Sequence, residues 1–187
     1  MKTHPAALPL LASLLAFACA TPPGPPSYVA TTLQPTRGNT AAGTVWFIAD
    51  GADVRIRGRV SGLTPNQEHG FHVHEKGDCS SGDGMSAGGH FNPTGKPHGP
   101  PAGEHHAGDL PALTADAAGT VAIDSRVRAV ADGPSGFAGK ALIVHVNPDD
   151  YTTQPTGNSG ARIACGVVSG TAGVDVEGRS LPVPKDL

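Results

Sequence analysis

The chain has 187 residues, enough for one domain with a packed core and for additional segments at its ends. Its formal charge is −3, from 16 acidic and 13 basic residues, which excludes a general attraction for polyanions, so we expect no nucleic-acid partner. With 26 glycines, 18 prolines and only 4% aromatic residues, the composition favours short strands joined by many turns over long helices.

Residues 1–20 are typical of an export signal. A lysine at position 2 precedes an apolar run over 6–17, which is too short to span a bilayer as a stable helix. Cleavage directly before Cys19 would leave this cysteine at the new N-terminus for lipidation, as in bacterial lipoproteins. Cleavage after position 20 would remove it. Both alternatives stay open, and both predict that the mature chain lies outside the cytoplasm.

The rest of the chain divides into three parts. Residues 21–28 are rich in proline and predict a stiff linker, because each proline removes a donor and fixes its own backbone angle. We expect one globular domain over residues 29–170. Residues 171–187 have the composition of a loop, and the sequence assigns this tail no role.

Seven segments of the domain have strand character and are separated by clusters of Gly, Pro, Asn and Asp. They are Tyr28–Leu33, Gly43–Asp50, Val54–Ser61, Gly70–His74, Val121–Val127, Ala141–Val146 and Arg162–Val168. In the third segment, apolar residues alternate with Arg55, Arg57 and Arg59, which predicts a solvated basic face. Asp50 and Gly51 predict a hairpin turn before it, because both residues tolerate positive φ. Helical periodicity is absent.

Two cysteines remain in the domain. Outside the cytosol thiols tend to pair, so we expect Cys79 and Cys165 to form a disulfide, with two buried free thiols as the alternative. The bridge would close a loop of more than eighty residues and stabilise the fold by roughly 4 kcal/mol.

Histidines gather in one region of the chain. His72 and His74 alternate on a predicted strand, so both imidazoles point from one face and can grip one metal. The long irregular segment from Glu75 to Leu110 then supplies His90, His98, His105, His106 and Asp109. Imidazole suits copper and zinc, and three histidines with a carboxylate suit tetrahedral zinc. A metal-scavenging surface tract is the alternative, but the spacings are irregular and set by Gly and Pro.

Five sequence blocks, in order, resemble the copper/zinc superoxide dismutases in their bacterial exported form. They are Gly-Phe-His-Val-His-Glu at 70–75, Gly-Gly-His-Phe-Asn-Pro at 88–93, His-Ala-Gly-Asp-Leu at 106–110, Val-His-Val-Asn-Pro-Asp-Asp at 144–150 and Gly-Asn-Ser-Gly-Ala-Arg-Ile-Ala-Cys-Gly-Val at 157–167. The resemblance runs from about Val29 to Val168. It implies an all-β fold, a Greek-key β-sandwich or flattened β-barrel with a metal-binding loop and a channel loop.

The resemblance also implies a set of ligands for two cofactors, copper and zinc. Copper would be held by His72, His74, His90 and His145, and zinc by His90, His98, His106 and Asp109. His90 would serve both metals, because each metal makes a ring nitrogen acidic enough to coordinate.

Further roles follow from the same resemblance. Asp149 would link a copper-side and a zinc-side histidine and fix their tautomers. Arg162 would sit at the mouth of the copper channel and attract the superoxide anion, and Thr156 would form another wall of that channel. Only His106 has the spacing of the zinc motif, so we expect His105, like His69 and His4, to be exposed and without a ligand role.

The implied function is the dismutation of superoxide to dioxygen and hydrogen peroxide by a cycling copper next to a structural zinc. His90 and Arg162 would be its catalytic residues, and the periplasm or cell envelope the compartment it protects. A redox-inactive copper carrier would lack a copper ligand, the bridging histidine or Arg162, and none is missing. A metal-binding adhesive protein is a further alternative. A monomer and a homodimer are both compatible with the sequence.

Overall fold

The computed structural model describes residues 1, 28–128, 130, 132–169, 177–183 and 185. The described strands are β1 (Tyr28–Pro35), β2 (Ala42–Asp50), β3 (Asp53–Ser61), β4 (Glu68–His69), β5 (Phe71–His74), β6 (Leu113–Thr114), β7 (Val121–Arg128), β8 (Ala141–His145) and β9 (Arg162–Val167). The helices among these described residues are two short 3-10 turns, η1 (Met85–Ala87) and η2 (Gly133–Phe137). No helix in the described part of the chain is long and apolar enough to cross a bilayer.

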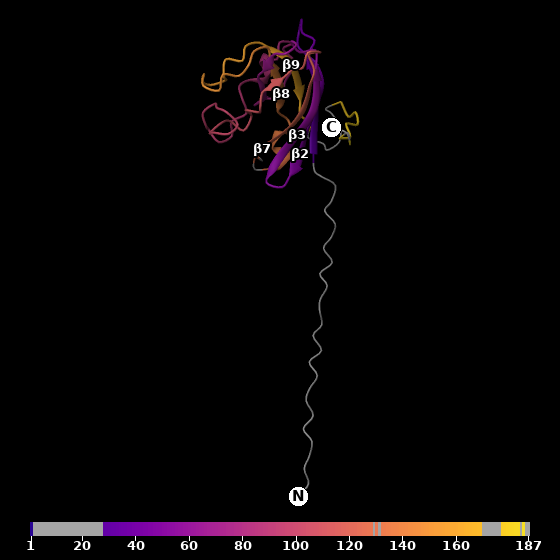
Figure 1. Cartoon of the computed structure of the whole chain (residues 1–187), viewed down its shortest axis with the longest axis vertical. Coiled ribbons are helices and arrows are strands. Elements are labelled where there is room, and N and C mark those ends of the chain that lie inside the picture. The colour runs from indigo at the N-terminus through magenta and orange to yellow at the C-terminus, as the bar shows by residue number, and fades with distance from the viewer. Residues whose placement is uncertain (2–27, 129, 131, 170–176, 184, 186–187) are drawn as a thin grey trace.

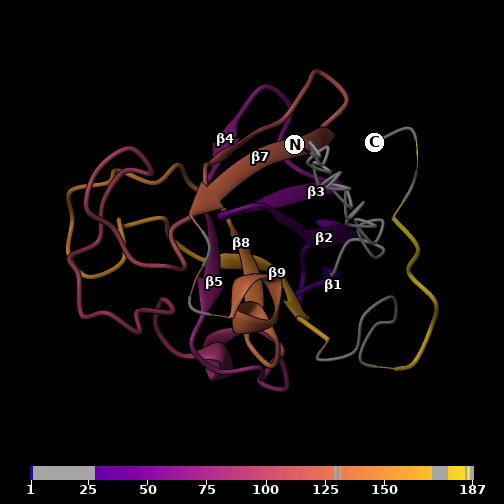
Figure 2. The same ribbon diagram turned by 90° about the horizontal axis from the view of Figure 1, so that it is seen from below.

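Seven strands form one curled antiparallel sheet in the order β5-β8-β9-β1-β2-β3-β7. The sheet folds over at β1, which pairs with β2 from Tyr28 to Leu33 and with β9 at Gln34 and Pro35. One half of the sheet therefore packs against the other as a β-sandwich (Figures 1 and 2). This confirms the expected all-β sandwich.

The core lies between the two halves and consists of inward-facing residues from both. Val45 and Phe47 of β2 and Ile56 of β3 are fully buried. Phe137 of η2 stacks on Phe47, with ring centroids 4.9 Å apart, and closes the core on that side. Burial of these side chains is the main stabilising contribution to the sandwich, at about 1.5–3 kcal/mol for each large apolar side chain.

Each of the seven expected strands is present. In β3 the arginines alternate with buried Val54, Ile56 and Val60, as the pattern predicted. The β2–β3 turn differs by one residue from the expected one, because Asp50 pairs with Asp53 and the loop is Gly51–Ala52. Gly51 has φ 64°, a conformation that glycine adopts without strain. The two-residue strands β4 and β6 were missed, since a two-residue pair has no periodicity.

The order of the strands positions the histidine-bearing segments. β5 and β8 pair side by side at one end of the sheet, with His72 opposite Ile143. The long connections that follow β5 and β8 both lie on the same side of the sandwich, away from β2 (Figure 2). Segments far apart in the sequence therefore meet beyond one edge of the fold.

Several expectations lie outside the described residues. These are the export signal over 2–20 with Cys19 and His4, the linker up to residue 27, and the part of the tail over 171–176. Tyr28, the last residue of the expected linker, is the first residue of β1 and pairs with Ile48.

Candidate metal centre

β5 directs two imidazoles out of the sheet on one face. Phe71 and Val73 belong to the core, so the two-residue period points His72 and His74 the other way. His145 ends the neighbouring strand β8, where the register shifts between Val144 and His145. All three rings are buried, with at most 5% of each residue exposed.

Backbone hydrogen bonds draw the long loop after β5 back against the strand. The amide of Phe91 donates to the carbonyl of Val73, and the amide of Val73 donates to the carbonyl of Gly108. These contacts place His90 beside His74 and Asp109 beside His72 as isolated antiparallel bridges. These backbone contacts hold two parts of the loop, around His90 and around Asp109, against the strand that carries His72 and His74.

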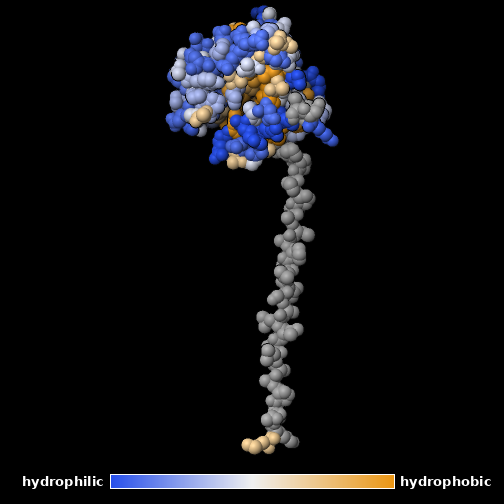
Figure 3. All heavy atoms as spheres, in the orientation of Figure 1, coloured by the Kyte–Doolittle hydropathy of each residue, from blue (hydrophilic) through white to orange (hydrophobic). Residues whose placement is uncertain are grey.

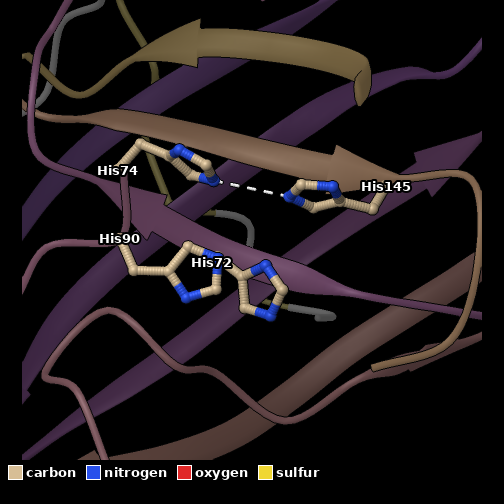
Figure 4. Close-up of side chains that lie close together, drawn as sticks. All are labelled: His72, His74, His90 and His145. Carbon is tan, nitrogen blue, oxygen red and sulfur yellow. Dashed lines mark hydrogen bonds between the residues drawn. The ribbon is translucent and has the colours of Figure 1, made fainter. Parts of the chain in front are cut away.

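The first group consists of His72, His74, His90 and His145, whose ligand atoms lie within 4.8 Å of one another (Figure 4). The Nε2 atoms of His74 and His145 face each other at 3.4 Å. Their other nitrogens are occupied: His74 Nδ1–H donates to the Gly88 carbonyl, and His145 Nδ1–H donates to the Gly160 carbonyl. Because a carbonyl only accepts, these contacts leave both Nε2 atoms free as ligands.

The second group consists of His90, His98, His106 and Asp109, again within 4.8 Å of one another and all buried. The Asp109 carboxylate is the centre of the group. His90 Nδ1 lies 2.8 Å from Asp109 Oδ1, and His98 Nδ1 lies 3.0 Å from Asp109 Oδ2. His90 belongs to both groups, so one imidazole stands between the two ligand sets.

The buried nitrogens show that both groups fit metal ions. His72 Nδ1, His90 Nε2, His98 Nδ1 and His106 Nδ1 are buried and make no hydrogen bond. Buried polar atoms almost always have partners, and metal ions are suitable partners for four such nitrogens in two adjoining groups. Four imidazoles suit copper, and three imidazoles with one carboxylate suit zinc.

Asp149 lies behind both groups and links them. His72 Nε2–H donates to Asp149 Oδ2 at 2.7 Å, and His98 Nε2–H donates to Asp149 Oδ1 at 2.8 Å. Each ring therefore keeps Nδ1 for a metal. Gly157, with φ 67°, packs directly on this contact, and a Cβ there would overlap the Asp149 carboxylate.

Burial lowers the pKa values of three rings of the first group, His72, His74 and His145, and so keeps these rings neutral. It lowers the pKa of His72 to about 4, although the hydrogen bond to Asp149 opposes the shift, and it lowers the pKa of His145 to about 3. The carboxylates behave oppositely. Burial pushes the pKa of Asp109 up, but the hydrogen bonds from His90 and from the His106 amide outweigh it and hold that pKa below its usual value. Neutral imidazoles beside an ionised carboxylate are the protonation states that bind metals.

Arg162 places a cation next to the first group. Its guanidinium donates to the carbonyls of Gly84 and Gly88, each at 2.6 Å, and is half-buried. Burial is the main cause of the lowered pKa values of His74 and His145, and the positive charge of Arg162 lowers them further. The carbonyl of Gly88 accepts from both Arg162 and His74, so one peptide group holds the guanidinium and the His74 ring in place.

The predicted disulfide is present. Cys79 and Cys165 are bonded, with their Cα atoms 5.9 Å apart. The bond ties the loop that supplies Gly84 and Gly88 to β9, the strand that carries Arg162. Thr156 lies half-buried in the long connection that follows β8, next to Gly157. Its assignment to the channel stays a prediction.

The expectation that His69 is exposed is wrong. His69 is 0% exposed, because it pairs with Leu113 as part of β4 and donates from Nδ1 to the His145 carbonyl at 2.8 Å. His105 is half-buried rather than exposed, and its Nδ1 contacts the His106 carbonyl. Neither belongs to a ligand group among the described residues.

Apart from Asp149, sequence reasoning missed the groups that orient the ligands. The carbonyls of Gly88 and Gly160 select the tautomers of His74 and His145, and a backbone carbonyl leaves no sequence signal. Gln154 also escaped notice: its side chain accepts from the His98 amide at 2.9 Å and donates to the His98 carbonyl at 2.8 Å. This pair of hydrogen bonds holds the long connection after β8, which carries Gln154, against the long connection after β5, which carries His98.

A curled β-sandwich in which two buried ligand groups share one imidazole defines a protein with adjoining sites for two metals. The family model of copper/zinc superoxide dismutase (SODC) matches residues 41–168. The chain belongs to this family of oxidoreductases, whose cofactors are copper and zinc. A solved structure described as the clock protein EA4 is similar, with 37% sequence identity and a TM-score of 0.69 over 81% of this chain and 99% of that chain.

Proposed function

We propose that this chain dismutates superoxide outside the cytoplasm and so protects the cell envelope. Membership of the copper/zinc superoxide dismutase family supports the reaction. The observation that carries the proposal is the sharing of His90 by two buried groups whose free nitrogens have no other partner. A surface tract that scavenges metal would expose its histidines to solvent.

The two ligand groups would hold different metals. His72, His74, His90 and His145 would hold copper, and His90, His98, His106 and Asp109 would hold zinc. Copper supplies the one-electron chemistry, in which one superoxide is oxidised to dioxygen and a second, with two protons, is reduced to hydrogen peroxide. His90 Nε2 is the shared-ring atom that faces the first group and can hold a proton for the peroxide.

Arg162 would bind and orient the substrate. Superoxide is a small anion, and a fixed guanidinium beside the first group attracts it although the whole chain carries a formal charge of −3. The bonds to Gly84 and Gly88 hold this cation in place, so no ordering of a flexible side chain is needed when the anion arrives.

The test is superoxide decay catalysed by the mature chain loaded with copper and zinc. We expect fast turnover, and loss of activity in His145→Ala, which removes one copper ligand. His105→Ala is the matched control, because His105 neighbours a ligand without belonging to either group. A fully metallated chain that is inert towards superoxide would reject the proposal and favour a copper carrier.

The export signal that the sequence predicts supports a location in the cell envelope, either anchored through lipidated Cys19 or as a soluble periplasmic protein. Mass spectrometry of the mature N-terminus separates the two: a lipid adduct on Cys19 supports the anchor, and an N-terminus at Thr21 supports the soluble form. The homodimer also stays a proposal, and light scattering of the purified chain measures the mass that decides it.

A further inference from the structure

The backbone of His98 lies in a stretch of the connection after β5 that builds no secondary structure. Residues 97, 100 and 101 are prolines, which have no N–H to donate, and His98 belongs to no strand or helix. Yet His98 is only 3% exposed. Its amide and carbonyl are therefore shielded from water and need partners from another part of the chain.

The side chain of Gln154 supplies both partners. Its Oε1 accepts from the His98 amide at 2.9 Å, and its Nε2–H donates to the His98 carbonyl at 2.8 Å. A primary amide carries the same donor and acceptor as a peptide group, so Gln154 bonds to His98 as a paired residue of an antiparallel strand would. Among the described residues, the backbone of His98 makes no other hydrogen bond.

The same connection after β8 also holds the imidazole of His98. Asp149 Oδ1 accepts from His98 Nε2–H at 2.8 Å and from the Tyr151 amide at 3.1 Å. The ring of Tyr151 lies beside the His98 ring and nearly parallel to it, with 11° between the planes and 6.4 Å between the centroids. Tyr151 has φ 55°, a strained conformation for a bulky residue, which persists only where the surroundings fix it. One short segment, residues 149–154, therefore contacts both the ring and the backbone of His98.

Polar contacts, rather than apolar burial, join the two connections. Residues 92–109 of the connection after β5 and residues 147–161 of the connection after β8 contribute nothing to the hydrophobic core of the described chain. Figures 1 and 2 show the two connections next to each other, and Figure 3, in the orientation of Figure 1, shows a mainly hydrophilic surface on this side of the domain. The hydrogen bonds of Gln154 and Asp149 therefore carry much of this contact.

We propose that Gln154 is a positioning residue for zinc, because it fixes the backbone of a ligand and so slows the loss of the ion. His98 belongs to the second ligand group, and its Nδ1 is buried without a hydrogen bond. A four-coordinate ion leaves its site by losing its ligands one after another. A ligand whose backbone is held returns to the ion before the next ligand leaves. The inference rests on the zinc site of the proposed function.

Release of zinc from the copper- and zinc-loaded chain into an excess of chelator tests the proposal. We expect release to be about 10-fold faster in Gln154→Ala, a change typical of residues that support a metal ligand. Gln34→Ala is the matched control, because Gln34 is an exposed glutamine on β1 and belongs to neither connection. Its release rate should equal that of the wild type.

Hydrogen exchange of the His98 amide gives a second readout that a general loss of stability would not single out. It is measured by NMR on the same metal-loaded chains with copper reduced, which is diamagnetic. The His98 amide should exchange about 10-fold faster in Gln154→Ala, since its acceptor is gone. The Val73 amide, which donates to the Gly108 carbonyl, should exchange at an unchanged rate.

Equal zinc release from Gln154→Ala and the wild type would overturn the proposal. So would an equal acceleration of exchange at His98 and Val73, because the substitution would then act on the whole fold. Neither readout involves superoxide. A chain that holds zinc but is inert towards superoxide would reject the proposed function and leave this inference intact, whereas a chain that binds no zinc would reject both.

Discussion

Asp149 connects the two ligand groups, because it accepts a hydrogen bond from one histidine of each. It leaves Nδ1 of His72 and Nδ1 of His98 free for metal by engaging their Nε2 atoms. Removing either bond lets the ring rotate or change tautomer. One carboxylate therefore keeps both metal sites in their binding geometry.

Asp149→Asn should lose about 10- to 100-fold in metal affinity, because an amide has one acceptor oxygen for two N–H donors. Competition with a chelator, followed by metal analysis, measures the loss. Asp150→Asn is the matched control, since Asp150 is exposed and bonds only within its own loop, to Thr152 and Thr153. Equal metal retention in the two variants would contradict this assignment.

Among the elements, the loop between Cys79 and Gly88 is attached to β9 in two ways. The disulfide fixes it to β9, and the guanidinium of Arg162 binds its carbonyls at Gly84 and Gly88. The disulfide joins residues 86 positions apart, so it restricts the unfolded chain strongly.

The double variant Cys79→Ser, Cys165→Ser should lower the free energy of unfolding by about 4 kcal/mol, since the unfolded chain regains its loop entropy. Urea denaturation of the oxidised protein and of the variant, both with metals bound, measures this difference. Reducing the wild-type protein should bring its unfolding midpoint to that of the variant. Identical midpoints before and after reduction would show that the bridge does not stabilise the fold.

For the whole molecule, the buried histidines make stability depend on pH when no metal is bound. The pKa values of His72 and His145 fall from 6.5 to about 4 and about 3 on folding, mainly because of burial. Between pH 6.5 and 4 the unfolded chain therefore binds protons that the folded chain does not. Stability is complete above pH 6.5 and is lost as the pH falls through this window.

The metal-free protein should accordingly lose up to about 1.4 kcal/mol of unfolding free energy per pH unit for each of these histidines below pH 6.5. Urea midpoints at pH 8, 7, 6, 5 and 4.5 test the sign and the window. The midpoint should be nearly constant from pH 8 to 7. A midpoint that stays constant down to pH 4.5 would show that the rings are solvated, against the buried geometry.

The sequence by itself predicted the sandwich strands, two groups of candidate metal ligands and the disulfide partners. Alternation along β3 and the His-x-His of β5 are local patterns, because a strand repeats every two residues. The histidine motifs, and the family resemblance that they carry, indicate copper and zinc from the sequence alone. Family membership and the disulfide bond confirm those two expectations.

Tertiary structure alone decided the contacts that depend on backbone groups far apart in the chain. His69 is buried because the β4–β6 pair encloses it against the carbonyl of His145, and no local pattern marks such a position. The carbonyl partner of His74 and the indole contact between Trp46 and Leu181 are likewise invisible in the sequence. Every residue carries the same carbonyl, so only the fold determines which one meets a given donor.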